Sequence, residues 1–419
     1  MKKHFFGWWV AFGSFTTLFT VVGMLYYGFP VFYPHLIESF GWSRADTMAG
    51  YAISTFVIGP IFGLSAGILI DRYGSKKIML VGILMTGAAL ISFSLMQSLT
   101  HFYLFYFMHT IGYACAGPVP NQVLISQWFN RLRGRVMGVT YLGIGLGGTA
   151  APLVVHYLVT NYGWRAAFQV LGVVILLIVF PLVLFLVKAK PSEKGLYPDG
   201  ASEPPASTLS TGPSTDFTLR EAIGTRAFWA ICIGSFLSIA SIGAVIQHLV
   251  LYLRDLGFSG ENAAQILSIL VISSLPGRIV MGYLSDIYPK KYVMLAAYLF
   301  VGLSVPLLFI ADVFPAAYIF AFIFGFGMGA DYMMIPLVTA ESFGLSSMGK
   351  IMGAIFVTDT LGQALFPYVV GYIFDSTGNY QIAFWLVTAA ALAGAVAILF
   401  IPGHQGSARV TLPVSEAAS

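Results

Sequence analysis

The stretch Ser274-Leu-Pro-Gly-Arg278-Ile-Val-Met-Gly-Tyr-Leu-Ser-Asp286 lies in an apolar run that is longer than the core of a soluble domain requires. Arg278 is the only Lys or Arg that we place inside any such run. A guanidinium keeps its proton in proteins, so inside a membrane it needs an anion or a water-filled cavity. We therefore treat Arg278 as a candidate functional residue and ask whether the run around it spans a membrane.

The composition of the whole chain is that of a membrane protein. Of its 419 residues, 58% are hydrophobic and only 9% are charged. About 20 helical residues cross the apolar core of a bilayer, and several continuous runs of that length follow one another here. Because these runs do not alternate between apolar and polar residues, they predict helices and exclude a transmembrane β-barrel. The net charge of +4 reflects basic loops and does not indicate a nucleic-acid partner.

Charges and clusters of Gly, Pro and Asn divide the apolar sequence into predicted spans. Twelve spans result, at 6–33, 45–70, 77–97, 102–128, 135–159, 164–187, 227–252, 261–284, 292–311, 314–340, 350–374 and 380–402. The fold class predicted is an all-α membrane protein of two pseudo-symmetric six-helix bundles.

The segment between the two sets of spans is rich in Ser, Thr, Pro and Ala, and it cannot bury a core of its own. We expect an N-terminal bundle over 1–188, a cytoplasmic linker over 189–216, a C-terminal bundle over 217–403 and a tail over 404–419. With the N-terminus inside, 17 of the 21 Lys and Arg residues fall in cytoplasmic segments and three outside. This bias predicts a multi-pass protein of the cell (inner) membrane with both termini in the cytoplasm.

The two halves of the sequence repeat one another at an offset of 215 residues. The matched positions are Gly67 with Gly282, Asp71 with Asp286, and 134–138 with 349–353. Homologous halves of this kind usually place the substrate at their interface, near the middle of the membrane. Arg278 aligns with Gly63, so the repeat predicts an anion site that is formed mainly by the C-terminal half.

The stretch Gly67-Ile-Leu-Ile-Asp71-Arg72-Tyr-Gly74-Ser-Lys76 joins the second and third spans. Asp71 can accept hydrogen bonds from helix-start amides or from an arginine, and Gly74 permits a tight turn. The stretch resembles the loop signature of the major facilitator superfamily. The resemblance implies a gating motif on the cytoplasmic side, which also includes Asp286 in the second half; a purely structural role as a helix-turn-helix staple is compatible with it.

The stretch Trp128-Phe-Asn-Arg131-Leu-Arg133-Gly-Arg135-Val-Met-Gly138 opens the fifth span, and Phe6-Gly-Trp8-Trp9 opens the first. Both resemble signatures of the monocarboxylate transporter family. In that family an arginine of the eighth helix binds the substrate carboxylate, and Arg278 occupies the matching position. A guanidinium suits this role because its fork binds a carboxylate through two hydrogen bonds. The positions of the family's proton-coupling groups hold Ser274 and Tyr27 here.

Asp331 and Asp359 lie in the tenth and eleventh predicted spans, at about the depth of Arg278. We expect them to be partners of Arg278 and candidates for carrying a coupled proton, although fixed hydrogen bonds between helices are an equal alternative. Further candidates for lining the substrate site are Asn121, Tyr332 and His248, with Tyr27 and Phe356 as apolar walls. Aromatic residues in helices more often serve packing alone.

The resemblance implies a secondary active transporter, which moves small monocarboxylates such as L-lactate and pyruvate together with a proton by alternating access. We predict no enzymatic activity, cofactor or metal, because no Cys/His metal spacing, phosphate-binding loop or nucleophile elbow is present. The expected partners are the monocarboxylate anion, the proton and the bilayer, and we expect a monomer.

Three alternatives compete with this interpretation. An oxalate/formate-type anion antiporter calls for a second intramembrane cation, but the eleventh span offers Asp359 and no Lys. A non-transporting membrane sensor is disfavoured by the short tail and the lack of an appended domain. A multidrug exporter leaves Arg278 without an anionic client.

Overall fold

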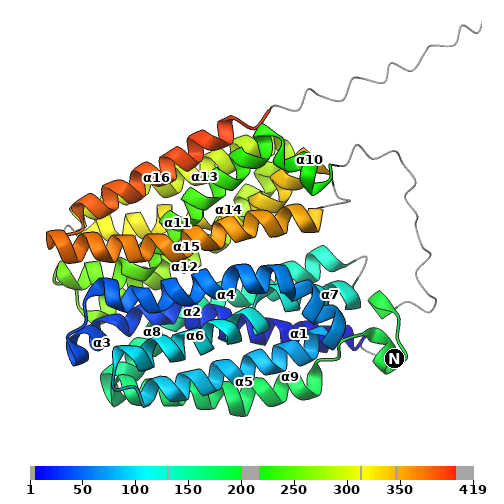
Figure 1. Cartoon of the computed structure of the whole chain (residues 1–419), viewed down its shortest axis with the longest axis horizontal. Helices are drawn as coiled ribbons and strands as arrows, with labels where there is room; N and C mark the ends of the chain where they lie inside the picture. Colours follow the sequence, from blue (N-terminus) through cyan, green and yellow to red (C-terminus); the bar gives the residue numbers. More distant parts are fainter. Residues whose placement is uncertain (1–4, 130–131, 201–216, 312–313, 345–347, 403–419) are drawn as a thin grey trace, which may run out of the picture.

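The computed structural model describes residues 5–129, 132–200, 217–311, 314–344 and 348–402. The helices form two bundles that lie side by side, with α1 to α9 in one and α10 to α16 in the other (Figure 1). We call these the first and the second bundle. The helices of both bundles run roughly parallel or antiparallel to one common axis.

The first bundle contains α1 (Gly7–Thr17), η1 (Leu18–Met24), α2 (Leu25–Gly28), η2 (Phe29–Val31), α3 (Tyr33–Phe40), α4 (Arg44–Tyr73), α5 (Ser75–Ser94), α6 (Leu99–Ala116), α7 (Pro118–Trp128), α8 (Arg133–Val174), η3 (Ile175–Val179) and α9 (Phe180–Leu186). Two short turns, η4 (Pro191–Lys194) and η5 (Pro198–Gly200), follow in the linker. The second bundle contains α10 (Leu219–Ile223), α11 (Arg226–Asp255), α12 (Gly260–Ile287), α13 (Lys290–Ser304), η6 (Val305–Ile310), α14 (Phe314–Phe343), α15 (Met348–Thr377) and α16 (Gln381–Leu399).

These elements match the predicted spans closely. Nine segments of the described residues are long and apolar enough to cross a membrane, and one of them, Val136–Leu186, has the length of two spans. That segment bends at Gly163, which has a φ of 80°. The bend separates the fifth predicted span from the sixth. The other two predicted spans are α4 and the pair α6–α7, which is interrupted at Gly117. The prediction of an all-α fold with twelve spans is confirmed.

The bundles meet along two pairs of helices, α4 with α15 and α8 with α12. Gly371 on α15 lies against the backbone of Arg44 and Ala45 at the beginning of α4. Farther along the same pair, Gly59 faces Thr360. The contact thus extends from the end of the bundles where α4 begins to about the middle of both helices. We call this end of the bundles the latch end; α3 lies there, and the N-terminus of the chain lies at the opposite end (Figure 1).

Within the second bundle, α12 and α14 approach each other closely through glycines. A Cβ atom on Gly325 would collide with the carbonyl of Leu270, and one on Gly329 with the carbonyl of Ser274. Small residues let membrane helices pack backbone against backbone. The contact fixes the backbone of α12 beside α14 only one turn before Arg278.

A pair of Gly→Ala substitutions tests this packing. Gly329→Ala is expected to lower the free energy of unfolding by about 1–3 kcal/mol, the usual effect of overpacking. Gly353→Ala is the control, because a Cβ there meets open space, and replacing a helical glycine by alanine stabilises by up to about 1 kcal/mol. The measurement is thermal unfolding of the purified protein in detergent. Equal melting temperatures for the two variants would contradict the close contact.

Candidate functional site

Arg278 lies on α12, two residues after Pro276, and its side chain is partly exposed. Its Nε donates a hydrogen bond to the backbone carbonyl of Gly329 on α14, at 3.3 Å. The described residues form two ion pairs, Arg44–Asp255 and Lys290–Glu341, and Arg278 belongs to neither. The charge of this guanidinium is therefore not neutralised by any described side chain.

Arg278 faces the first bundle. Its charge acts on the phenol groups of Tyr27 on α2 and Tyr141 on α8, which are both in that bundle. Three residues earlier, Leu275 packs against Gly145 of α8. Arg278 thus lies about one turn beyond this contact of α12 with α8, on the side away from the latch end. An unpaired cation at this interface has the charge and the hydrogen-bond donors that a small anion needs.

The expected pairing of Arg278 with Asp331 or Asp359 is wrong. Gly329 faces α12, where a Cβ on it would meet Ser274, and Asp331 follows two residues later on the same helix. Two residues turn an α-helix by about 200°, so the side chain of Asp331 points away from α12. Asp359 instead faces α11, where its Oδ1 accepts a hydrogen bond of 2.6 Å from Ser235.

Asp331 and Asp359 belong to a separate group of polar side chains inside the second bundle. We call Asp331, Asp359, Ser235, Ser238 and Tyr298 the acid cluster. Its members come from α11, α13, α14 and α15, and each is at most 3% exposed. The hydroxyls of Ser238 and Tyr298 lie beside Asp331 as possible donors, although none of these oxygens makes a hydrogen bond of regular geometry.

The structure does not place Asn121 or His248 beside Arg278. Asn121 is fully buried, and its amide accepts from Ser14 at 2.7 Å while donating to the carbonyls of Ala116 and Gly117. These bonds satisfy the two carbonyls that the break before α7 leaves free, so Asn121 supports the helix and does not line a cavity in this structure. His248 is also fully buried, and it lies at the latch end, where its ring contacts Tyr380.

The two aromatic candidates have different environments. Tyr27 is 7% exposed and packs against Gly148 of α8, so it lies between the two bundles near Arg278. Phe356 on α15 is 38% exposed. The side chain of Tyr332 lies outside the described residues.

The gating motif is described in part. Gly74 has a φ of 82° and joins α4 to α5, as the predicted tight turn requires. Lys76 donates to the carbonyl of Leu184 at 2.8 Å, which ties this turn to α9. The guanidinium of Arg72 lies over the ring of Tyr73, 5.4 Å from its centre. The candidates Gly67, Asp71 and Asp286 lie outside the residues whose side chains the structure describes.

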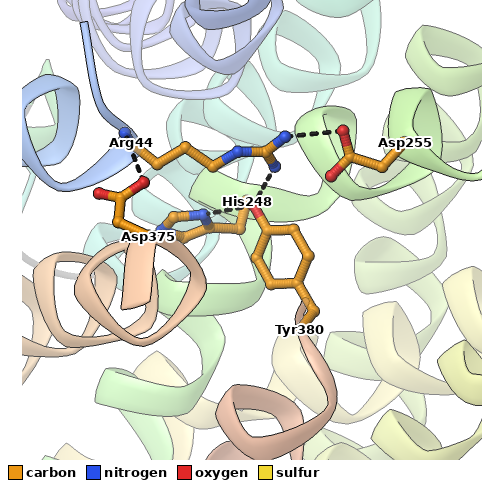
Figure 2. A network of polar contacts seen from close by, with 5 residues as sticks. All are labelled: Arg44, His248, Asp255, Asp375 and Tyr380. Atoms are coloured by element: carbon orange, nitrogen blue, oxygen red, sulfur yellow. Dashed lines mark hydrogen bonds and ion pairs between the residues drawn. The ribbon is translucent and has the colours of Figure 1, made fainter. Parts of the chain in front are cut away.

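A polar network at the latch end holds the two bundles together (Figure 2). We call Arg44, His248, Asp255, Asp375 and Tyr380 the latch. Arg44 belongs to the first bundle and the other four residues to the second. The guanidinium of Arg44 donates to Asp255 at 2.7 Å and to the hydroxyl of Tyr380 at 2.5 Å. It also stacks on Phe374, with 3.8 Å between the guanidinium carbon and the ring centre.

Asp375 caps a helix of the opposite bundle. Its carboxylate accepts hydrogen bonds from the backbone amides of Arg44 and Ala45, at 3.1 and 2.7 Å. These amides are among the first of α4 and have no partner within that helix, and the helix dipole favours a negative charge there. Separation of the bundles at this end therefore leaves both the carboxylate and the start of α4 without these partners.

His248 connects the latch to a proline in α15. One ring nitrogen lies 2.8 Å from the carbonyl of Pro367 and the other 3.0 Å from the Tyr380 hydroxyl. The carbonyl can only accept, so Nε2 donates to it, and in neutral histidine Nδ1 then accepts from Tyr380. The hydrogen bonds thus run in one direction, from Arg44 through Tyr380 and His248 to Pro367. Figure 2 shows the part of this chain from Arg44 to His248.

The latch could not be predicted from the sequence. The charged residues of the latch lie next to the ends of three predicted spans, where charged residues are common; they are Arg44, Asp255 and Asp375. Nothing in their spacing along the sequence marks them as partners. The available signal was that Arg44 is one of only three basic residues on the predicted outer side.

The comparisons with known proteins agree with this architecture. A family model described as Major Facilitator Superfamily matches residues 10–280 and 231–417. The chain belongs to the major facilitator superfamily. A solved structure of this fold, a bacterial homologue of the human lysosomal transporter Spinster in an inward-facing and unoccupied conformation, superposes with a TM-score of 0.69 at 16% identity. The match covers 96% of this chain and 95% of the other, and it shows the shared fold.

The curated relatives of this major facilitator protein include monocarboxylate transporters. Monocarboxylate transporter 13 of Bos taurus is 28% identical over 94% of this chain and 89% of its own length. Monocarboxylate transporter 2 of Mesocricetus auratus is 26% identical over 90% of this chain and 80% of its own length. These relatives confirm the resemblance to the monocarboxylate transporter family. Their names describe transporters.

Breaking the latch is expected to open the major facilitator carrier at that end. Asp375→Asn weakens charge-assisted hydrogen bonds worth about 1.5–3 kcal/mol, so the open fraction should rise about tenfold or more. The measurement is the labelling rate of Thr360→Cys by an impermeant thiol reagent from the latch side, because both native cysteines are buried. Asp46→Asn, an exposed carboxylate in the same turn of α4, is the control. Equal rates for Asp375→Asn and the control would show that the latch does not hold this end closed.

Proposed function

We propose that this major facilitator is a proton-coupled symporter of small monocarboxylates, such as L-lactate and pyruvate. The observation that carries the proposal is Arg278, an intramembrane cation without an ion-pair partner among the described residues, at the interface of the two bundles. Related proteins named monocarboxylate transporters support the same substrate class.

In the proposed complex, the substrate carboxylate binds the terminal nitrogens of Arg278 through two hydrogen bonds. The Nε atom is already held by the carbonyl of Gly329, which keeps the fork oriented before the substrate arrives. The hydroxyls of Tyr27 and Tyr141 belong to the opposite bundle, so a substrate at Arg278 can contact both bundles. Contact with both bundles lets the substrate favour the rearrangement between them.

The cycle we propose alternates access to this site from the two membrane faces. The latch closes one end in the present structure, and its hydrogen bonds and ion pair must break when that end opens. Neutralisation of Arg278 by the carboxylate reduces the charge that has to be desolvated during reorientation. We propose that the carrier works as a monomer in the cell (inner) membrane, with both termini in the cytoplasm and the latch on the outer face.

Asp331 or Asp359 carries the coupled proton in this proposal. Both are buried, and each has at least one carboxylate oxygen without a hydrogen bond. A proton on such an oxygen removes the charge that burial disfavours. These carboxyls form no ion pair with Arg278 that the substrate carboxylate could replace. Protonation of the carboxyls therefore influences the Arg278 site indirectly, through the conformation of the second bundle.

Removing the cation tests the anion site. In proteoliposomes, Arg278→Gln is expected to reduce lactate uptake driven by an inward proton gradient by roughly two orders of magnitude or more. The reason is that truncating a hydrogen-bonded charge pair costs about 2–5 kcal/mol. Arg226→Gln, at an exposed position of the same bundle, should leave uptake near the wild-type value. Undiminished uptake by Arg278→Gln, in protein with a normal melting temperature, would contradict the proposal that Arg278 binds the substrate carboxylate.

The pH dependence of uptake tests the proton site. Uptake by the wild-type protein should rise as the external pH falls, because protonation loads the carrier. Asparagine imitates the protonated acid permanently, so Asp331→Asn or Asp359→Asn should flatten this dependence. The control is again Asp46→Asn, whose side chain is exposed. If both buried variants keep the wild-type pH profile, the proton travels elsewhere.

A further inference from the structure

The environment of Asp331 contains more unsatisfied oxygen atoms than one carboxylate. Asp331 on α14 is fully buried, and neither of its oxygens makes a hydrogen bond. The hydroxyls of Ser238 on α11 and Tyr298 on α13 face it, and both are also fully buried without a partner. Four oxygen atoms from three helices therefore lie in one buried group, and none of them makes a hydrogen bond of regular geometry.

No described basic side chain faces this group. The other polar neighbours are Asp359 on α15 and, beside Asp359, the thiol of Cys232 on α11. Each of these groups is either neutral or acidic, so they cannot balance the charge of Asp331. A buried carboxylate without a counter-charge is strongly disfavoured, and it must therefore take up a cation or a proton.

We propose that Asp331, Ser238 and Tyr298 form a binding site for Na⁺. Carboxylate and hydroxyl oxygens are ligands that suit hard cations, and the site offers no nitrogen or sulfur ligand. The charge of the site favours a monovalent ion, because only one of the two carboxylates has both oxygens available. Asp359 already accepts from Ser235 through Oδ1, which leaves its Oδ2 for a proton.

The Na⁺ site adds a second ion to the proposed transport cycle. Only the coupling of this ion to transport rests on the proposed function. It assigns Asp331 to Na⁺ and leaves Asp359 as the carrier of the proton. Binding of Na⁺ itself depends only on Asp331, Ser238 and Tyr298 and not on the substrate. The ion would connect α11, α13 and α14, so we expect it to stabilise the second bundle against unfolding.

The experiment measures thermal unfolding of the full-length protein in detergent, with NaCl replaced stepwise by choline chloride or KCl at constant ionic strength. The melting temperature of the wild-type protein should rise with Na⁺ and show no matching rise with K⁺ or choline. Asp331→Asn should abolish the Na⁺ response. Tyr298→Phe and Ser238→Ala should each raise the Na⁺ concentration needed for half of the response by about tenfold, the effect of losing one polar partner of a charged group.

Two controls separate the site from general effects. Ser241→Ala removes a buried hydroxyl one turn farther along α11 that already donates to the carbonyls of Leu237 and Val387, so its Na⁺ response should stay normal. Asp359→Asn should also retain the response. If Asp331→Asn does not fold, Tyr298→Phe and Ser238→Ala still decide, because neither introduces a new atom.

The outcomes distinguish this inference from the proposed function. A wild-type protein that responds to pH but not to Na⁺ overturns the Na⁺ site, as does a Na⁺ response that persists in Asp331→Asn or in both hydroxyl variants. Arg278→Gln should lose lactate uptake and keep the Na⁺ response. Lactate uptake without any Na⁺ response in the wild-type protein would overturn the Na⁺ site and support the monocarboxylate proposal. A Na⁺ response without lactate uptake would support the Na⁺ site and overturn the monocarboxylate proposal.

Discussion

A charge buried in a membrane has to be neutralised or hydrated, and this requirement organises the structure. Arg278 meets the requirement only in part, through one hydrogen bond to the carbonyl of Gly329. The remaining charge faces Tyr27 and Tyr141 across the interface between the bundles. The glycine contacts of α12 with α14 hold the arginine there, and the two bundles provide the surfaces that can move around it.

The second bundle keeps its positive and negative intramembrane charges apart. Arg278 lies on its outer surface toward the first bundle, whereas Asp331 and Asp359 lie inside it on the faces toward α11 and α13. If the acids were bound to Arg278, a substrate carboxylate would have to displace them. Their separation leaves the cation available to a carboxylate and the acids available to small cations. In the proposed cycle both kinds of ion act on the same bundle.

The latch has to hold the two bundles together at one end and still allow that end to open. Its charged groups lie at or near the ends of helices, where the side chain of Arg44 is 12% exposed and that of Asp255 is 38% exposed. Ion pairs that water can reach contribute little to stability. The cap that Asp375 provides for α4 is more specific, since it satisfies backbone amides that α4 cannot satisfy by itself. Closure of this end therefore depends on several modest interactions, which can be exchanged for water.

The sequence by itself determined the class of fold and the main candidate residue. Long apolar runs require helices in a bilayer, since every backbone group must be bonded within its own segment. A lone arginine in such a run stands out by composition alone. The repeat and the family signatures then predicted the two bundles and the position of Arg278 between them.

Only the tertiary structure decided which polar groups meet. Depth along a helix can be estimated from the sequence, and Arg278, Asp331 and Asp359 were expected at a similar level. The direction of each side chain depends on how the helix is rotated about its axis, and packing sets that rotation: Gly329 turns one face of α14 to α12, so Asp331 faces the opposite way. The latch likewise joins Arg44 to residues more than 200 positions away, and no local pattern records such a contact.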